Sequence, residues 1–400
     1  MARRNFVQHL PFLSAFSGIG GLDLGLERAG FLGVGAIESD ATARDSLATN
    51  RPDVRLLEPH EINEVARNLT PRDLGLSERE LVLLAAGPPC QPFSKAAQWS
   101  SHGGRGMADD RASCLNGLVE LVERFLPHAL LIENVPGFVQ GGRSALPFLK
   151  ARLGDVNRRS GTRYRLHCRT LNAVDFGVPQ RRKRAFILAL RDGADFAWPL
   201  ATHIGCPVRA WDALMGLRLT CPPIARGRFA GLLASVPEGK NYQHFTERGE
   251  GPSLFGYRRR YWSFLLKLAK AEPSWTLSAS PGPATGPFHW ESRPLAPEEM
   301  LRLQSFPSAW KVVGLHRDRV RQVGNATPPL VAEVLGRSIA SQLFDADFRV
   351  EPLTLTIRRA AHVPPPTPPQ SVAAPFMAMA GSHAAHPGAG QGPQGRQANR

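Results

Sequence analysis

The chain has 400 residues, of which 42% are hydrophobic, so it can bury one large core or two smaller ones without metals or disulfides. The 38 Gly and 35 Pro have no three-residue period, which excludes a collagen-like protein. No apolar run reaches the ~18 residues of a membrane span, and no signal-type stretch follows the N-terminus, so we expect a cytoplasmic protein. A net charge of +15 favours an acidic partner.

The positive charge is concentrated in the second part of the chain. Residues 1–150 carry 15 basic and 17 acidic side chains, whereas residues 151–400 carry 34 basic and 17 acidic ones. Such a field attracts polyanions, usually nucleic acid, although a solvated basic face explains it equally well. The five cysteines, at 90, 114, 168, 206 and 221, lack zinc or redox spacing, so we expect free thiols and no metal.

Residues 5–190 alternate between short apolar runs and helical patterns. The candidate strands are residues 5–16, 33–38, 80–87, 128–135 and 186–190. The candidate helices among them are residues 22–30, 41–50 and 114–126. This alternation predicts a doubly wound, Rossmann-like α/β fold with a mostly parallel sheet, whose binding residues lie in the loops after the carboxyl ends of the strands.

The regular alternation fades after residue 190. Residues 191–295 are rich in Pro, Gly, Arg and aromatic residues, which predicts a second, smaller and irregular domain. Helical periodicity returns at residues 297–306 and 328–344. We therefore assign the larger domain to residues 1–190 plus 313–350 and the smaller domain to residues 191–312.

The C-terminal segment has low sequence complexity. Residues 355–400 are dominated by Pro, Ala, Gly and Gln and contain few large apolar side chains. Such a segment buries too little apolar surface to offset the entropy of ordering, so we expect a disordered tail, and we expect its part from about residue 360 to be dispensable for catalysis.

A glycine-rich turn, Phe16–Gly21, joins the first candidate strand to the first candidate helix. Glycines let the backbone approach a bound group closely, and Glu38, at the end of the next strand, can accept hydrogen bonds from ribose hydroxyls. The pair predicts a nucleoside pocket. The third glycine comes earlier than in a pyrophosphate-binding turn, so a cofactor without phosphates fits at least as well.

Two further loops follow buried strands. In the first, prolines flank Cys90 in GPPCQPFS, and because prolines restrict the backbone they hold this thiol in a defined orientation suited to a nucleophile. In the second, Glu133 begins ENVPGF, where desolvation would favour a neutral carboxyl that can donate a proton. The structural alternatives are a small core cysteine and a capping or ion-paired glutamate.

Seven sequence blocks, in this order, resemble those of the bacterial DNA (cytosine-5)-methyltransferases. They are FSGIGG, Glu38, GPPCQPFS, ENVPGF, QRRKR at Gln180–Arg184, RLQSFP at Arg302–Pro307 and GNATPP at Gly324–Pro329. The resemblance implies methyl transfer from S-adenosylmethionine to carbon 5 of cytosine in a specific duplex DNA sequence, as the modification enzyme of a restriction–modification system with a possible cognate endonuclease. The smaller domain would then recognise the target.

The resemblance also implies the catalytic roles. Cys90 would add to carbon 6 of cytosine, Glu133 would take up the charge that develops on the ring, and Arg184, with Arg182 behind it, would hold the base. The cofactor residues that it implies are Phe16, Gly18, Ile19, Gly20, Gly21, Leu22, Glu38, Glu61, Ile62, Leu115 and Asn325. Glu61 departs from the family pattern, which has Asp at this position.

The target carbon lies inside the duplex, so the resemblance implies base flipping. The residues expected to contact DNA are Gln91, Ser94, Gln180, Arg258, Arg259 and Arg260, with the loop Ser100–Gly106 closing over the flipped base.

Three alternative functions remain open. A tRNA cytosine-5 methyltransferase shares the same motifs, but the ~100 residues between QRRKR and RLQSFP favour duplex DNA. A non-catalytic relative would not need Cys90, Glu133 and Arg184. A nicotinamide-dependent Rossmann enzyme explains the glycine-rich turn but not PPCQ.

Overall fold

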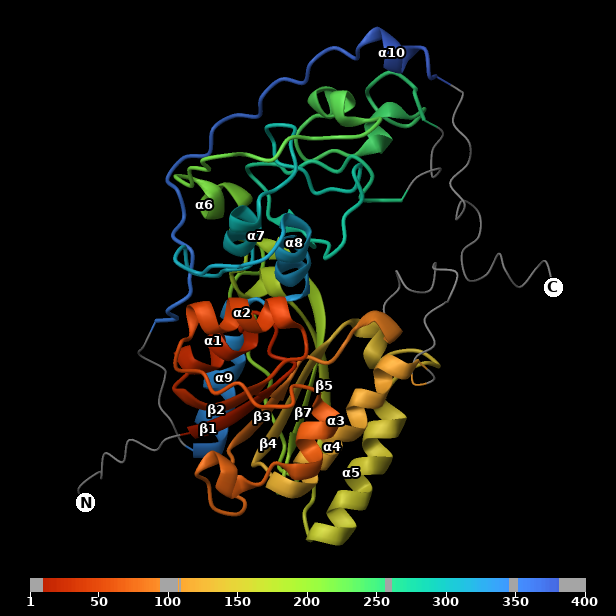
Figure 1. The fold of residues 1–400 in the computed structure, drawn as a ribbon. Helices are drawn as coiled ribbons and strands as arrows, with labels where there is room; N and C mark the ends of the chain where they lie inside the picture. The colour runs from red at the N-terminus through yellow and green to blue at the C-terminus, as the bar shows by residue number, and fades with distance from the viewer. Residues whose placement is uncertain (1–9, 94–106, 108, 256–260, 345–351, 381–400) are drawn as a thin grey trace, which may run out of the picture.

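The computed structural model describes residues 10–93, 107, 109–255, 261–344 and 352–380. The larger, α/β part occupies the lower half of Figure 1, and a smaller part with little regular structure occupies the upper half. Among these ranges, every helix is too short or too polar to cross a membrane.

The larger domain is built on a six-stranded sheet with the order β2-β1-β3-β4-β7-β5. The strands are β1 (Leu10–Ala15), β2 (Phe31–Ile37), β3 (Leu83–Ala86), β4 (Ala129–Asn134), β5 (Arg165–Asn172) and β7 (Lys183–Leu190). The first four are parallel to one another, and β7 is antiparallel to both β4 and β5. This sheet confirms the predicted mixed α/β, mostly parallel architecture.

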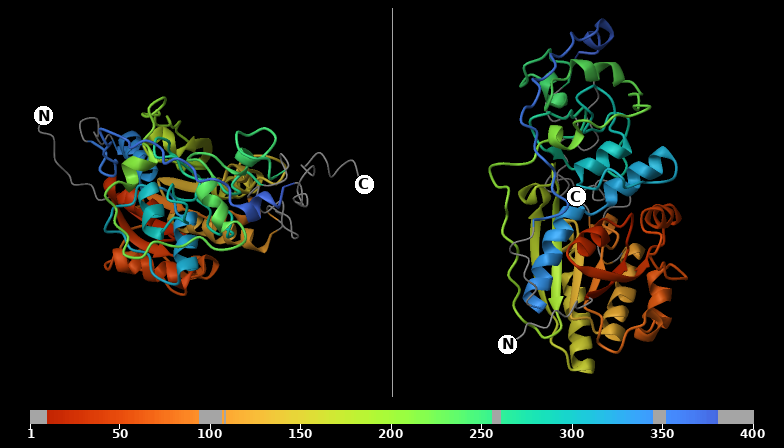
Figure 2. Two further views of the ribbon diagram at one scale, coloured as in Figure 1. Left: turned by 90° about the horizontal axis from the view of Figure 1, so that it is seen from above. Right: turned by 90° about the vertical axis from the view of Figure 1, so that its left-hand side faces the viewer.

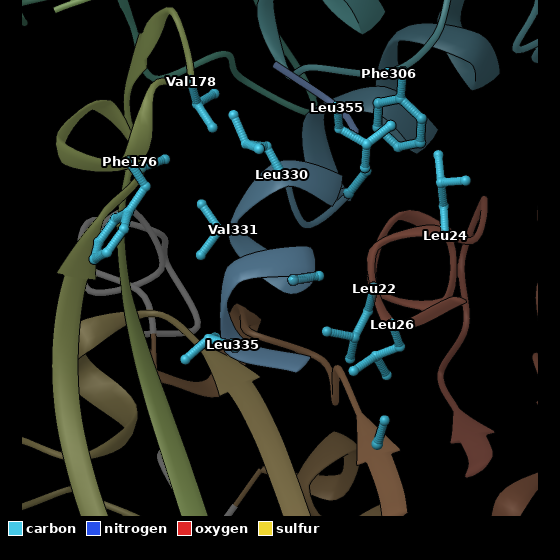
Figure 3. Packing of buried hydrophobic residues seen from close by; sticks show 14 of the residues in the cluster. Leu22, Leu24, Leu26, Phe176, Val178, Phe306, Leu330, Val331, Leu335 and Leu355 are labelled. Atoms are coloured by element: carbon cyan, nitrogen blue, oxygen red, sulfur yellow. The ribbon is translucent and has the colours of Figure 1, made fainter. Parts of the chain in front are cut away.

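Helices cover both faces of this sheet, so its central strands are apolar on both sides. Leu131 of β4 faces a core shared with α1 and α9, whereas Leu130 faces a core shared with α3, α4 and α5. Figure 3 shows Leu22 and Leu26 of α1 and Leu335 of α9, which all belong to the first core. The helices are α1 (Gly21–Arg28), α2 (Ala41–Asn50), α3 (Ile62–Asn68), α4 (Cys114–Phe125), α5 (Leu146–Ser160) and α9 (Pro329–Phe344).

The smaller domain has a core of its own, which contains Leu232, Tyr242, Phe255 and Phe288. Five further elements lie outside the six-stranded sheet and the helices that cover it: α6 (Ala210–Leu214), α7 (Pro297–Leu303), α8 (His316–Asn325) and the paired strands β6 (Gln180–Arg181) and β8 (Ser274–Trp275). Short 3-10 helices connect the elements of both domains: Pro71–Leu74, Gln91–Phe93, Asp110–Ser113, Pro136–Phe138, Ala173–Phe176, Ala230–Ser235 and Tyr242–Phe245. Residues of α7 pack into the larger core, although the sequence groups them with the smaller domain.

Two segments differ from the sequence-based expectation. Strand β5 was not predicted, because it lies at the edge of the sheet and most of its side chains are polar and at least partly exposed. The tail was expected to be disordered from residue 355, but its described part, 355–380, follows the smaller domain as far as α10 (Ala374–Met377). Figure 2 shows the same path from the side.

Candidate active site

The site lies where four parallel strands end at one edge of the sheet. The strand register pairs Ala15 of β1 with Ile37 of β2 and with Ala86 of β3, and it pairs Ala86 with Ile132 of β4. The next residues of all four strands therefore emerge side by side. This register brings Glu133, near the end of β4, together with the loops that begin at Phe16, Glu38 and Gly87, although these residues are far apart in the sequence.

These loops enclose a cavity of about 340 Å³. Most of the predicted site residues line it: Phe16, Gly18, Ile19, Gly21, Leu22, Glu38, Cys90, Gln91, Glu133, Arg184 and Asn325. A volume of this size is typical of a pocket for a small organic ligand. One cavity thus holds both the residues expected to bind a nucleoside and the thiol, carboxyl and guanidinium groups expected to carry the chemistry.

The glycine-rich turn adopts a backbone that side chains disfavour. Phe16, Gly18 and Gly20 have φ angles of 58°, 55° and 80°, and Gly20 directly precedes α1. A Cβ on Gly18 would meet nothing within 4 Å, so the backbone there is open to a ligand. A Cβ on Gly21 would lie 2.2 Å from the carbonyl oxygen of Thr327, which makes glycine necessary where α1 meets the GNATPP loop.

Glu38 holds the turn against the end of β2. Its Oε2 accepts a hydrogen bond of 2.7 Å from the Gly18 N–H, and its Oε1 accepts one of 2.8 Å from the Asp40 N–H. Burial raises the pKa of Glu38, and these two N–H groups oppose the rise. Each carboxylate oxygen has a second lone pair, so Glu38 can also accept from a ligand hydroxyl.

The Cys90 loop is fixed by the loop after β4. Asn134 donates from Nδ2 to the Pro88 carbonyl oxygen at 3.0 Å, and the rings of Phe93 and Phe138 are 4.7 Å apart in an edge-to-face arrangement. A Cβ on Gly137 would lie 2.2 Å from the Phe93 carbonyl oxygen, so the two loops are in close backbone contact. The motifs PPCQPF and ENVPGF therefore form one rigid unit.

The thiol of Cys90 is partly buried and lies among charged groups. Burial raises its pKa, Arg184 opposes the rise, Glu133 adds to it and Arg182 opposes it. Burial therefore favours the protonated thiol of Cys90, and the guanidinium of Arg184 is the charge that most favours the thiolate.

Glu133 and Arg184 both line the cavity and are in direct contact with each other. Its side chain is 9% exposed, and its Oε1 lies 3.0 Å from Arg184 Nε. The contact is an ion pair without hydrogen-bond geometry, and Oε1 has no hydrogen-bond partner among the described residues. A buried oxygen of this kind is costly unless a ligand supplies the missing partner, so the carboxyl group is suited to receive one.

Arg182 lies behind the cavity rather than in it. The residue is 1% exposed, and its Nη2 donates to the carbonyl oxygens of Gly324 and Asn325 at 3.0 and 3.4 Å. Burial, followed by the charge of Arg184, lowers its pKa to about 9. Arg182 therefore positions the GNATPP loop, which carries Asn325 into the cavity.

Several predicted residues do not line the cavity. Leu115 and Ile62 are buried in the core between the sheet and α3–α4, Glu61 is exposed at the start of α3, and Gly20 packs against Leu47. Gln180 is fully buried and accepts from the Leu277 N–H, so it lies inside the protein, and its contact with DNA stays a prediction. Three predicted sites lie outside the described residues: Ser94, Ser100–Gly106 and Arg258–Arg260.

Sequence reasoning missed four charged residues that line the cavity: Asp23, Asp40, Arg111 and Arg321. Arg321 pairs with Asp40 at 2.5 Å, and although burial would raise the pKa of Asp40, the hydrogen bonds from Arg321 and Thr42 hold it at about 2. Asp23 and Arg111 also line the cavity. The sequence offered one indication for Asp23, because it is a lone charge within the apolar pattern LDLGL. Arg321 and Asp40 are too far apart in the sequence for any local pattern to pair them.

Comparison with known proteins places these residues in a family. The family model described as C-5 cytosine-specific DNA methylase matches residues 10–205 and 243–341. The chain is 34% identical over 385 residues to the Type II methyltransferase M.SacI of Streptomyces achromogenes, covering 85% of this chain and 95% of that one. It is 31% identical over 357 residues to the Type II methyltransferase M.Eco47II of Escherichia coli, covering 83% and 79%.

Solved structures support the fold independently. The structure of a Spodoptera frugiperda DNMT2 mutant matches with a TM-score of 0.58 at 16% identity, covering 83% of this chain and 99% of that one. The S. pombe Dnmt2 methyltransferase matches with a TM-score of 0.57 at 18% identity, covering 84% and 99%.

Proposed function

Because the chain belongs to the C-5 cytosine-specific DNA methylase family and is thus a DNA cytosine methyltransferase, we propose that its cavity holds S-adenosylmethionine beside a flipped cytosine. The observation that carries this proposal is that Glu38, Cys90 and Glu133 line the same cavity. The identity to Type II methyltransferases supports a role as the modification enzyme of a restriction–modification system, with duplex DNA as substrate and a cognate endonuclease acting on the same site.

The Glu38 end of the cavity fits the methyl donor. Gly18 leaves its backbone open, Phe16 can stack on an adenine ring, and the buried carboxylate of Glu38 can accept from two ribose hydroxyls. When bound, S-adenosylmethionine supplies an electrophilic methyl group on a sulfonium. The residues that hold it are Phe16, Gly18, Ile19, Gly21, Leu22, Glu38 and Asn325.

Replacement of Glu38 by glutamine tests this assignment. Glutamine keeps one acceptor oxygen but loses the charge, so we expect the KM for the methyl donor to rise about tenfold while kcat at saturating donor stays within about twofold. Steady-state methyl-transfer kinetics measure both constants. Glu64→Gln, on the exposed face of α3, is the control. An unchanged KM in Glu38→Gln would contradict the assignment.

At the other end of the cavity, Cys90 is the nucleophile. Carbon 5 of cytosine is a weak nucleophile, and addition of the Cys90 thiolate to carbon 6 makes it electron-rich. The thiol proton passes to solvent, and the guanidinium of Arg184 stabilises the thiolate that remains. After methylation, the proton on carbon 5 passes to solvent, and the electron pair that it leaves expels the thiolate and restores the aromatic ring.

Glu133 and Arg184 stabilise the charge that this addition creates. The carboxyl group of Glu133, whose Oε1 has no hydrogen-bond partner among the described residues, can accept from the amino group of cytosine and can donate a proton to ring nitrogen 3, and Arg184 can donate to the ring carbonyl oxygen. Both groups are held before the substrate binds, Glu133 by the end of β4 and Arg184 by the antiparallel β7. Their orientation therefore costs little at the moment of reaction.

The cytosine must leave the duplex to reach this cavity, at a cost of a few kcal/mol. Gln91 is exposed at the cavity mouth and can fill the emptied stack. Ser94 and Arg258–Arg260 remain predicted DNA contacts.

Trapping with 5-fluorocytosine tests the proposed function. Because fluorine on carbon 5 cannot leave as a proton does, the adduct with Cys90 cannot break down, and we expect a covalent complex with fluorinated duplex DNA that depends on S-adenosylmethionine. Denaturing gels and mass spectrometry of the linked peptide measure it. Fluorinated tRNA, tested in parallel, examines the alternative substrate, and an adduct with tRNA alone would overturn the proposal. The absence of an adduct with either nucleic acid, from a preparation that methylates normal DNA, would also overturn it.

A further inference from the structure

The C-terminal residues 352–377, here called the strap, bind three ion pairs of the folded protein in the same way. The first pair is Glu333–Arg337 on α9, at 2.9 Å, and the side chain of Glu333 is fully buried. The N–H groups of Thr354 and Leu355 donate to Glu333 at 2.7 and 3.1 Å, and Arg337 donates to the Pro352 carbonyl oxygen at 2.9 Å. The acid accepts from the strap and the base donates to it.

The second pair repeats this pattern on α6. Arg209 Nη2 lies 2.8 Å from Asp212 Oδ1, and the Asp212 side chain is fully buried. The Ala360 N–H donates to Asp212 at 2.8 Å, and Arg209 donates to the Ala360 carbonyl oxygen at 2.7 Å. A single strap residue thus has both of its backbone polar groups bound.

The third pair lies within the smaller domain. Lys270 Nζ is 2.5 Å from Glu238 Oε1, and their side chains are only 9% and 3% exposed. The Thr367 N–H donates to Glu238 at 3.0 Å, and Lys270 donates to the Pro365 carbonyl oxygen at 3.3 Å. Buried charges need this full set of partners, so the strap is part of the site that holds each pair.

The end of the strap joins the core of the smaller domain. The Gln370 N–H donates to the Ala234 carbonyl oxygen at 3.0 Å. The Phe376 ring packs over Gly231, so that a Cβ added to this glycine would lie 3.3 Å from the ring. Val372 and Phe376 pack against the core of that domain. Its middle is rich in proline, which restricts the free segment to extended conformations and lowers the entropy lost on docking.

The strap therefore connects two separate cores. It begins on α9, which packs in the larger core, passes α6 at the junction and ends on the core of the smaller domain (Figure 1). The two domains must contact one DNA duplex together, and every degree of freedom between them has to be lost when DNA binds. A strap that fixes their angle in advance removes that cost.

We propose that the strap positions the smaller domain for DNA, so that it sets the affinity for DNA and leaves the chemistry unchanged. This inference rests on the proposed function. It also replaces the expectation, drawn from sequence complexity, that catalysis does not need the tail. The strap residues touch neither the methyl-donor end of the cavity nor Cys90. Their action is therefore confined to the step in which the two domains engage the duplex.

A full-length variant tests the proposal without exposing a core. Ala360→Pro with Thr367→Pro removes the N–H groups that reach Asp212 and Glu238 and keeps an extended backbone. We expect the KM for DNA to rise at least tenfold, while kcat at saturating DNA and the KM for the methyl donor stay within about twofold. The control is Ala361→Pro with Ser371→Pro, since these N–H groups have no acceptor among the residues that the structure describes.

Rescue in trans separates positioning from folding. A chain that ends at Glu351 is expected to show the same rise in KM for DNA, and a synthetic peptide of residues 352–380 at millimolar concentration is expected to restore it. The peptide with proline at 360 and 367 should not. An unchanged KM for DNA in the double variant, or a fall in kcat that the peptide does not reverse, would overturn the proposal. An intact chain that fails to methylate DNA would instead refute the proposed function.

Discussion

Cys90→Ser is expected to lower methyl transfer to DNA by at least about 10³-fold. Serine has nearly the same size, but its hydroxyl is a far weaker acid than a thiol, so no anion forms to attack carbon 6. Arg184, which helps to stabilise the thiolate, cannot compensate for that difference. Transfer of labelled methyl groups from S-adenosylmethionine to duplex DNA measures the loss.

Two further measurements make this result specific. Binding of DNA and of the methyl donor to Cys90→Ser should stay within a few-fold of the unchanged protein, because Cys90 makes no hydrogen bond that holds the Gly-rich turn or Glu38. Cys168→Ser, at an exposed position of β5, should keep full activity. Transfer by Cys90→Ser at the normal rate would remove the covalent route.

The main elements of the site could be predicted because parallel strands end at one edge of a sheet. The positions of Glu38, Cys90 and Glu133 after apolar runs were enough to place them near one another, and the strand register brings them into one cavity. Leu115 was implied only by the family resemblance; it belongs to α4, and its side chain is buried in the core between α4 and the sheet. A residue that only a family motif implies can therefore be buried in the core near the cavity without lining it.

Long-range polar contacts could not be predicted. Arg321 reaches Asp40 across 281 positions, and nothing in either local sequence distinguishes it from an ordinary surface charge. The strap shows the same limit more clearly. Its composition predicts disorder because it offers little apolar surface, but its order comes from backbone N–H and carbonyl groups that complete three buried ion pairs elsewhere in the chain. Composition carries no information about such partners.

Glu133→Gln is expected to lower kcat by about 10² to 10³-fold with little change in the KM for the methyl donor. The amide has the same shape, but it carries neither the negative charge that pairs with Arg184 nor a proton to give to ring nitrogen 3. Charge therefore develops on the cytosine ring without a group to absorb it. Formation of the 5-fluorocytosine adduct should slow in the same proportion, which assigns the defect to the addition of Cys90.

The matched control is Glu123→Gln. Glu123 is also paired with an arginine, Arg159, at 2.5 Å, but the pair lies on the surface and outside the cavity. An exposed ion pair contributes at most about 1 kcal/mol, so activity should be unchanged. Glu38, at the other end of the cavity, still holds the Gly18 N–H in Glu133→Gln, and donor affinity therefore persists while the chemical step fails. Normal kcat in Glu133→Gln would show that another group neutralises the ring.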